Sequence, residues 1–132
     1  MVLGDLSDYL TSGGIASVTI YQGFLPDIPD KAMAIYEIPG LPAVHAMNAA
    51  AGAALVERPG VQFVVRDVVD EYATARTAID AVWKLIDGLP SRSINGVAYK
   101  WAMARQSPFT MGRDESGRVL LTFSADVWKA LS

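Results

Sequence analysis

The chain is organised around residues 61–88, where two hydrophobic periodicities meet without a break. Apolar side chains alternate along residues 61–66, and a β-branched run with a period of two predicts a largely buried strand. After Asp67 the period becomes helical. One helical face collects the apolar side chains of Tyr72, Ala75, Ile79, Val82, Trp83 and Ile86. Asp67 or Asp70 can cap the first turn, Gly88 can end the helix, and the helix is expected to be about 27 Å long.

The N-terminal part predicts a short helix and two strands. Along residues 2–10 the apolar side chains fall on one helical stripe, and two glycines follow as a stop signal. Residues 17–24 alternate, whereas residues 31–38 are apolar on both faces, and both patterns are typical of strands. The loop between them contains two prolines, which cannot donate ladder hydrogen bonds. We expect these two strands to form a hairpin-like pair.

An uncharged segment follows the second predicted strand. Residues 39–42 contain two prolines that we expect to end the strand. Residues 43–55 are rich in alanine but have few large side chains, so we expect a mobile or partner-ordered loop there and a turn at residues 57–60. The lack of charge raises the question of a membrane span. The residues that argue against one are Pro39, Gly40, Pro42, Asn48 and Gly52.

The C-terminal part predicts a second pair of strands. Residues 90–95 are expected to be a linker, and Asn95-Gly96 is a turn signal. Apolar residues then alternate along residues 97–104 and again along residues 118–128, so we expect these segments to pair. Residues 107–117 join them in a link that is longer than a tight hairpin requires. Loops of this length often carry contacts to other molecules.

Together these elements predict an α+β fold. We expect one domain over residues 1–132, built as a mixed, mainly antiparallel β-sheet with an N-terminal helix and one long central helix packed on it. Hydrophobic residues make up 52% of the chain, which is a high share for a soluble monomer. We therefore expect part of the apolar surface to meet another chain. The absence of cysteine excludes disulfide and thiolate chemistry.

Charge is distributed unevenly along the chain. Residues 1–87 carry five Lys and Arg against eleven Asp and Glu, a net charge of −6, whereas residues 88–132 carry six against three, a net charge of +3. The two parts either neutralise each other within one fold or form acidic and basic faces that meet between subunits. The overall charge of −3 gives no reason to expect non-specific nucleic-acid binding.

The sequence contains no recognisable catalytic, cofactor-binding or metal-binding motif. It lacks the nucleophile elbow, the phosphate-binding P-loop and the dinucleotide-binding glycine motif. His45 has no Cys, Asp or Glu at a ligand spacing, so we interpret its imidazole as a bystander. Residues 114–117 lack the ligand pattern of a cation loop and are better interpreted as a solvated turn. We predict no catalytic residues, no cofactor and no metal.

Several residues are instead candidates for contacts with a partner. Arg76 borders the apolar helix face, where either its stem stacks on Tyr72 and Trp83 or its guanidinium meets a partner. Phe109 and Met111 lie in the long link, where they either fold back onto their own sheet or anchor a neighbouring molecule. Charged residues beside them in that link could place both positive and negative charges at the rim of an interface. The candidate interface residues are Phe109, Met111, Arg113, Asp114, Glu115, Arg118, His45, Met47 and Arg76.

Three segments of the chain resemble the tail-terminator family of long-tailed bacteriophages, also described as minor capsid or tail-completion proteins. The first is residues 18–40, VTIYQGFLPDIPDKAMAIYEIPG, with two strands around a proline loop. The second is residues 61–89, VQFVVRDVVDEYATARTAIDAVWKLIDGL. The third is residues 107–127, SPFTMGRDESGRVLLTFSADV, in which a Pro and then Gly-x-Asp-x-x-Gly-Arg precede an alternating final strand. The third segment carries the resemblance most directly.

The resemblance implies a structural virion protein rather than an enzyme. A protein of this family would assemble as a hexameric ring on the finished tail tube, stop its growth and offer a joining surface to the head. The implied partners are further copies of the chain, the major tail tube protein and a head-completion or connector protein. DNA would pass through the ring lumen without sequence-specific binding. The implied location is the tail or neck of the virion, after assembly in the host cytoplasm, with no membrane.

Two alternatives stay open at the level of the sequence. A neighbouring neck protein, such as a head-closure or connector subunit, would share the ring symmetry but meet the portal instead of the tube. A small α+β enzyme or ligand-binding domain would need a pocket, which the sequence does not indicate.

Overall fold

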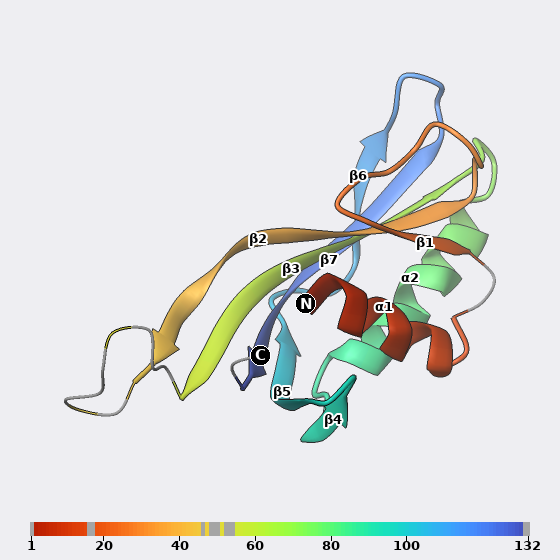
Figure 1. Cartoon of the computed structure of the whole chain (residues 1–132). Coiled ribbons are helices and arrows are strands. Elements are labelled where there is room, and N and C mark those ends of the chain that lie inside the picture. Colours follow the sequence, from red (N-terminus) through yellow and green to blue (C-terminus); the bar gives the residue numbers. More distant parts are fainter. Residues whose placement is uncertain (1, 16–17, 46, 48–50, 52–54, 131–132) are drawn as a thin grey trace.

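The computed structural model describes residues 2–15, 18–45, 47, 51 and 55–130 (Figure 1). Within these residues the elements are, in order, α1 (Val2–Ser12), β1 (Thr19–Gln22), β2 (Ala32–Val44), β3 (Val56–Asp67), α2 (Tyr72–Ile86), β4 (Arg92–Ile94), β5 (Val97–Ala104), β6 (Phe109–Arg113) and β7 (Val119–Lys129). The predicted α+β class, with an N-terminal helix and a long central helix, is confirmed.

The strands of the described residues form one seven-stranded sheet, with the order β1-β2-β3-β7-β5-β4 and with β6 paired to β7. β3 and β7 therefore lie in the middle. β5 pairs with the C-terminal half of β7 and β6 with its N-terminal half, so that β5 and β6 share one edge of this strand. All paired strands are antiparallel except β1 and β2.

The parallel pairing of β1 and β2 contradicts the hairpin-like pair that the sequence predicts. Thr19 at the start of β1 lies opposite Ala32 at the start of β2, so the connection over residues 23–31 must bring the chain back along the sheet. The prolines of this connection cannot join the ladder, which leaves the segment free to lie against the sheet. It is held there by Arg66, whose Nε donates to the carbonyl oxygen of Asp30 at 3.0 Å.

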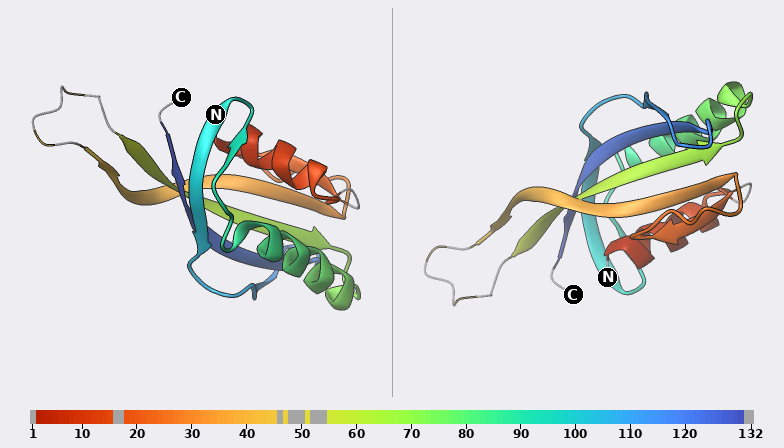
Figure 2. Two further views of the ribbon diagram at one scale, coloured as in Figure 1. Left: turned by 90° about the horizontal axis from the view of Figure 1, so that it is seen from below. Right: turned by 90° about the horizontal axis from the view of Figure 1, so that it is seen from above.

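Both helices cover the same face of the sheet (Figure 2). The hydrophobic core lies between the helices and this face, and alternate residues of β3 and β7 point into it. At its centre the rings of Phe63 and Phe123, which lie opposite each other in the register, stack with their centroids 4.8 Å apart. The predicted interior position of residues 61–66 is thus confirmed.

The central helix has the predicted orientation but is shorter than expected, and Tyr72, predicted to lie on the apolar face, is 47% exposed at its first turn. Its buried residues are Ala75, Ile79, Val82 and Ile86. Glu71 occupies the N-cap position without a side-chain hydrogen bond, so neither Asp67 nor Asp70 provides the predicted cap. At the other end Gly88 has a φ of +73°, the left-handed conformation that the sequence predicts for the residue after the helix.

The turn between β4 and β5 is the tight hairpin that Asn95-Gly96 predicts. Both residues have positive φ, 51° and 80°, as this type of two-residue turn requires. The predicted linker over residues 90–95 is wrong, because it contains β4, which pairs with β5. In β5 a register shift after Tyr99 interrupts the alternation, so that Tyr99 and Ala102 are both buried.

Helix α1 is tied to the β4–β5 hairpin by polar contacts in a buried position. The Tyr99 hydroxyl donates to Oδ2 of Asp5 at 2.6 Å, and Nδ2 of Asn95 donates to its Oδ1 at 3.0 Å. Burial alone would raise the pKa of Asp5, but the hydrogen bonds from Tyr99 and Asn95 help to lower it below its usual value. Burial and the neighbouring carboxylate raise the pKa of Tyr99. The folded protein therefore favours an ionised Asp5 beside a neutral Tyr99.

The link over residues 107–117 contains a strand, β6, which the sequence analysis missed. Phe109 lies opposite Thr122, and a register shift follows between Thr110 and Gly112. Gly112 has a φ of +103°, a conformation that favours glycine. Because this β-bulge breaks the alternation of side chains, the strand has no period-two pattern by which it could be recognised.

Candidate assembly interface

β2 and β3 continue beyond the body of the sheet as a two-stranded arm (Figure 1). We define the arm as residues 38–44 and 55–56, because Glu57 and Gly60 of β3 also pair with β7 and so belong to the body of the sheet. The ladder between the strands reaches Val44, which lies opposite Val56. Residues 57–60 therefore belong to β3 and do not form the predicted turn. Residues 43 and 44 of the predicted loop belong to β2, and most of the remainder of that loop lies outside the described residues.

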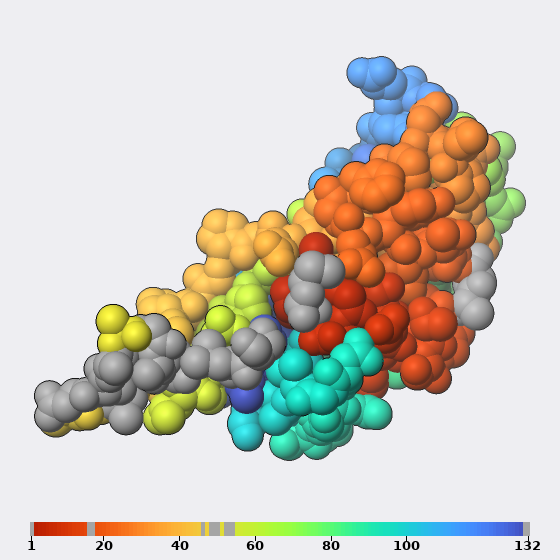
Figure 3. Space-filling view, viewed as in Figure 1, coloured from red at the N-terminus to blue at the C-terminus, as the bar shows by residue number. Residues whose placement is uncertain are grey.

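The arm exposes apolar side chains on an uncharged ribbon. Leu41, Val44 and Leu55 are 46%, 42% and 58% exposed. No Asp, Glu, Lys or Arg occurs between residues 38 and 56 of the sequence. A two-stranded ribbon cannot bury these side chains by itself, because it has no second layer to cover them. The arm projects from the body of the molecule (Figure 3), and these apolar side chains are exposed to water.

Two β-bulges shape the arm. Ile38 lies opposite Gly60 and Leu41 opposite Arg58, so β2 advances by one residue more than β3, and a second shift follows before Val44. Bulges bend a strand and tolerate proline, so the prolines at positions 39 and 42 do not end β2, contrary to the prediction. Gly40 is required at the first bulge, because a Cβ on this residue would overlap the carbonyl oxygen of Arg58.

Two arginines fasten the root of the arm through backbone carbonyl groups. Arg105 donates from Nη2 to the carbonyl oxygen of Pro39 at 2.8 Å and forms two hydrogen bonds with the Asp126 carboxylate, at 2.8 and 3.1 Å. Hydrogen bonding to this carboxylate raises the pKa of Arg105. Arg58 donates from Nε to the carbonyl oxygen of Pro42 at 2.6 Å. The part of the arm nearest the sheet is therefore held in place by its own subunit.

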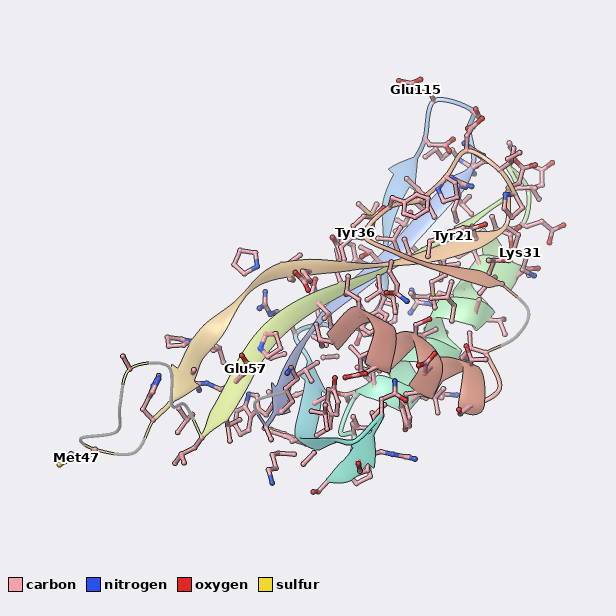
Figure 4. The ribbon with its side chains drawn as sticks, viewed as in Figure 1. Tyr21, Lys31, Tyr36, Met47, Glu57 and Glu115 are labelled. Carbon is pink, nitrogen blue, oxygen red and sulfur yellow. The ribbon has the colours of Figure 1, made fainter. Side chains whose placement is uncertain are left out.

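A groove of about 630 Å³ lies at the root of the arm. Two residues that line this groove, the buried Lys129 and Glu57, form an ion pair at 2.8 Å. Figure 4 shows Glu57 beside β3. The pair joins the end of β7 to the beginning of β3. Because both charges are already paired, this groove offers no free charge from these two residues to a ligand.

The opposite end of the molecule carries the β6–β7 hairpin, which contains most of the predicted interface residues. Phe109 and Met111 are 46% and 50% exposed. Their backbone belongs to the sheet, whereas their side chains remain largely in solvent. Both side chains are about half exposed, and their role as anchors for a partner stays a prediction.

Arg118 is a buried ion-pair centre rather than a rim residue. Its guanidinium contacts carboxylate oxygens of Asp114 at 2.7 Å, Asp27 at 2.8 Å and Asp30 at 3.2 Å. Hydrogen bonding to Asp27 and Asp114 raises the pKa of Arg118. Partial desolvation would raise the pKa of Asp114, but the hydrogen bonds from Arg118 help to lower it. The cluster fastens the connection over residues 23–31 to the β6–β7 hairpin.

Two further candidate arginines are also engaged within the subunit. Arg113 donates from Nη1 to the carbonyl oxygen of Val69 at 2.8 Å. Arg76 forms an ion pair with Asp80 at 3.3 Å and donates from Nη1 to the carbonyl oxygen of Pro108 at 2.8 Å. The guanidinium of Arg76 therefore holds the segment that leads into β6. The sequence interpretation anticipated an intramolecular role for Arg76 but not these two partners.

The remaining candidates lie at the two ends of the molecule (Figure 4). Glu115 is exposed at the tip of the β6–β7 hairpin. His45 is exposed near the end of the arm, and Met47 is 92% exposed beyond it. Sequence reasoning missed Leu41, Val44 and Leu55, which are the apolar surface of the arm. The uncharged run was visible in the sequence, but the bulges obscured its strand pattern.

The described residues show no arrangement suited to metal chemistry. No group of three or more His, Cys, Asp or Glu side chains in the described part could hold a metal ion. No helix of this part is both long and apolar enough to cross a membrane. The features that stand out are therefore the exposed apolar arm and the hairpin at the opposite end.

Comparison with solved structures finds chains that share this fold. A structure described as the virion of a native gene transfer agent particle contains a similar chain, with a TM-score of 0.71 at 10% sequence identity. The match covers 98% of this chain and 95% of that chain. A second solved structure, without a descriptive name, has a TM-score of 0.57 at 16% identity and covers 96% of this chain and 89% of that chain. At these identities the likeness shows a shared fold.

Comparison with protein families supplies the identity. No curated protein matches the chain. A family described as bacteriophage tail terminator protein matches residues 9–127, which include all three segments on which the sequence resemblance rests. This family is structural. The resemblance is thus confirmed, and the chain belongs to the bacteriophage tail terminator family.

Proposed function

We propose that copies of this chain form a closed ring that caps the tail tube of a phage-like particle and stops its growth. The ring is hexameric, as the family resemblance implies. Its other face forms the joining surface for a head-completion or connector protein, and DNA passes through the lumen without sequence-specific binding. The protein acts through interfaces in the tail or neck of the virion and needs no active site.

The apolar arm is the observation that carries this proposal. Leu41, Val44 and Leu55 are exposed on a ribbon that projects from the sheet, and contact with another chain would remove them from water. When the arm of one copy meets a different surface on the next copy, the contact is heterologous. A heterologous contact closes into a ring if its rotation allows and otherwise continues as a filament.

The charge asymmetry supports contact between copies less strongly than the arm does. Arg118, in the basic C-terminal part, is paired with Asp27 and Asp30 of the acidic N-terminal part, and Lys129 is paired with Glu57. Part of the charge difference is therefore neutralised within one subunit. We expect assembly to depend weakly on salt, because screening acts mainly on exposed charges. Dissociation on raising the salt concentration would favour the acid-to-base contact instead.

Binding to tail tubes tests the proposed function. The purified protein is mixed with assembled tail tubes, and negative-stain images are scored for density at the tube ends. We expect a ring of uniform size at one end of each tube. Binding to isolated head connectors but not to tubes would identify a neck protein instead. A protein that stays monomeric and binds neither would contradict the proposal.

A further inference from the structure

We infer that the arm of one copy seats in a groove beside helix α2 of the next copy. This inference rests on the proposed ring and identifies the contact that holds it together. The acceptor, here called the α2 groove, lies between α2 and the segment that follows α1, and its volume is about 480 Å³. Its lining includes Ile15, Lys31, Ala73, Thr77, Ala78 and Ala81.

The α2 groove is concave because short side chains line it. Ala73, Ala78 and Ala81 face it from the helix, and Ile15 contributes an apolar side chain from the other wall. Thr77 donates its hydroxyl to the carbonyl oxygen of Ala73 at 3.0 Å, so this group already has a partner. An aliphatic side chain can therefore approach the helix closely without leaving that hydroxyl unpaired.

The α2 groove and the arm also match in charge. Among the residues that line the groove, Lys31 alone is charged, and its long side chain can keep the ammonium group in water at the rim. Three other grooves of the described surface are each lined by at least two charged residues. Covering those charges with the uncharged arm would remove them from water without a new partner. The α2 groove does not impose this cost to the same extent.

The positions of the arm and the α2 groove fit a head-to-tail contact. Figure 4 shows Met47 at the end of the arm on one side of the molecule and Lys31, at the rim of the groove, on the other. The arm therefore points away from the groove of its own subunit. A second copy can receive it while presenting its own arm to a third, which is the geometry of a heterologous ring.

The arm makes this contact through side chains rather than by adding a strand. β1 pairs with β2 only from Ala32 to Ile35, so the described part of β2 beyond these residues has no partner on that edge. Pro39 and Pro42 lie in this stretch and have no N–H to donate. Prolines on an edge strand oppose extension of the sheet by a neighbouring chain. Recognition is thus left to exposed apolar side chains such as Leu41.

Site-directed cross-linking tests the contact, because the chain has no native cysteine to interfere. One preparation carries Met47→Cys, three residues beyond the end of β2 in the arm, and a second carries Thr77→Cys in the α2 groove. We expect mild oxidation of the mixture to give a covalent heterodimer. A chain with both substitutions should give a ladder of multimers up to the size of the ring, because each contact of a head-to-tail ring is then bridged.

A rival acceptor provides the matched control. Met111→Cys places an exposed thiol on the β6–β7 hairpin, where Met111 is 50% exposed. Bridging of Met47→Cys to this position instead of Thr77→Cys would overturn the inference. A ring seen by light scattering and electron microscopy without the arm-to-groove bridge would also overturn it, while leaving the proposed function intact. Absence of any ring would contradict both the arm-to-groove contact and the proposed function.

A charged substitution gives an independent test that needs no cross-link. Thr77→Glu places a carboxylate in the α2 groove, and we expect the concentration needed for assembly to rise by at least about tenfold. Thr11→Glu is the control, because Thr11 donates the same kind of bond, to the carbonyl oxygen of Ser7 at 3.0 Å, and does not line the groove. Equal assembly of both folded variants would contradict the proposed seat of the arm.

Discussion

The two ends of the molecule both expose apolar side chains, but the subunit holds them in different ways. At the β6–β7 end, Arg118 forms ion pairs with three carboxylates, and Arg113 donates to the carbonyl oxygen of Val69 in the connection before α2. Contacts within the subunit therefore hold the hairpin in place. At the arm end, Arg105 and Arg58 fasten the root through the carbonyl groups of β2. The comparison indicates that the hairpin is supported from within, whereas the apolar side chains of the outer arm stay exposed in the single subunit.

The largest expected effect comes from disrupting the hydrophobic core that supports both ends of the molecule. Ile79→Asp places a carboxylate in a fully buried position between α2 and the sheet. We expect the free energy of unfolding to fall by about 3 kcal/mol or more, because an unpaired charge is taken out of water. Urea unfolding followed by circular dichroism measures the change.

The matched control for the core lies on the exposed side of the same helix. Thr77→Asp adds the same carboxylate where the side chain is exposed. It should change the free energy of unfolding much less than Ile79→Asp does. Similar losses for both substitutions would contradict the observed orientation of α2.

The next effect separates the two ends directly. Leu41→Ser combined with Val44→Ser removes apolar side chains from the arm, where both are exposed. We expect the thermal midpoint of the monomer to stay nearly unchanged and the assembled ring to be lost, since the removed contacts lie between subunits. Differential scanning fluorimetry and size-exclusion chromatography with light scattering provide the two readouts.

The matching change at the hairpin is Phe109→Ser combined with Met111→Ser. If the arm carries the contact between subunits, this variant should still form rings. If the hairpin anchors the tail tube, these rings should bind tubes less well than wild-type rings do. Loss of rings in the hairpin variant, with rings retained in the arm variant, would reverse the roles assigned to the two ends.

A smaller effect is expected from loosening the frame of the hairpin. Arg118→Ala leaves Asp27, Asp30 and Asp114 without their shared cation, so their repulsion should lower the thermal midpoint. Arg113→Ala is the comparison, because it removes hydrogen bonds to carbonyl groups and leaves the carboxylate cluster intact. We expect the larger fall for Arg118→Ala. The reverse order would show that the cluster contributes little to the frame.

The smallest expected effect is on the pH dependence of stability, and it arises from Asp5 in helix α1. The folded protein lowers the pKa of Asp5 from its usual value of 3.8, so the unfolded chain binds this proton more readily. The contribution of Asp5 to stability is therefore present above pH 3.8 and is lost as the pH falls through the folded pKa. We expect Asp5→Asn to flatten the loss of stability measured between about pH 5 and pH 2. An unchanged slope would contradict a stabilising ionised Asp5.

Regular periodicity decided how much of the fold the sequence could predict. Val61 to Arg66 and the helical stripe through Ile79 keep one period over their whole length, and both are in the structure as predicted, except that Tyr72 at the start of the stripe is exposed. β6 and the arm were missed because bulges at Gly112 and near Gly40 shift the side chains out of register. Parallel pairing of β1 and β2 depends on the path of a loop, which local pattern does not encode.

The sequence predicted which residues of the β6–β7 link are exposed better than it predicted the contacts of the candidate arginines. The link around Phe109 and Met111 was recognised from its length and its apolar residues, and both side chains are exposed. The roles of Arg118 and Arg76 were not predictable in full. Each has one carboxylate partner four residues away, but Asp27 and Asp30 for Arg118, and the carbonyl oxygen of Pro108 for Arg76, are distant in the sequence. Pairing of this kind is a property of the folded chain rather than of residue spacing.

Tail-tube growth in the presence of the protein tests the central claim most directly. Tail tube protein is allowed to polymerise, the protein described here is added before growth is complete, and the lengths of the tubes are followed by electron microscopy. We expect the wild-type protein to fix the tube length, and the variant with Leu41→Ser and Val44→Ser, although folded, to let growth continue. Tubes that grow equally with and without the wild-type protein, or that the arm variant stops just as well, would contradict the account.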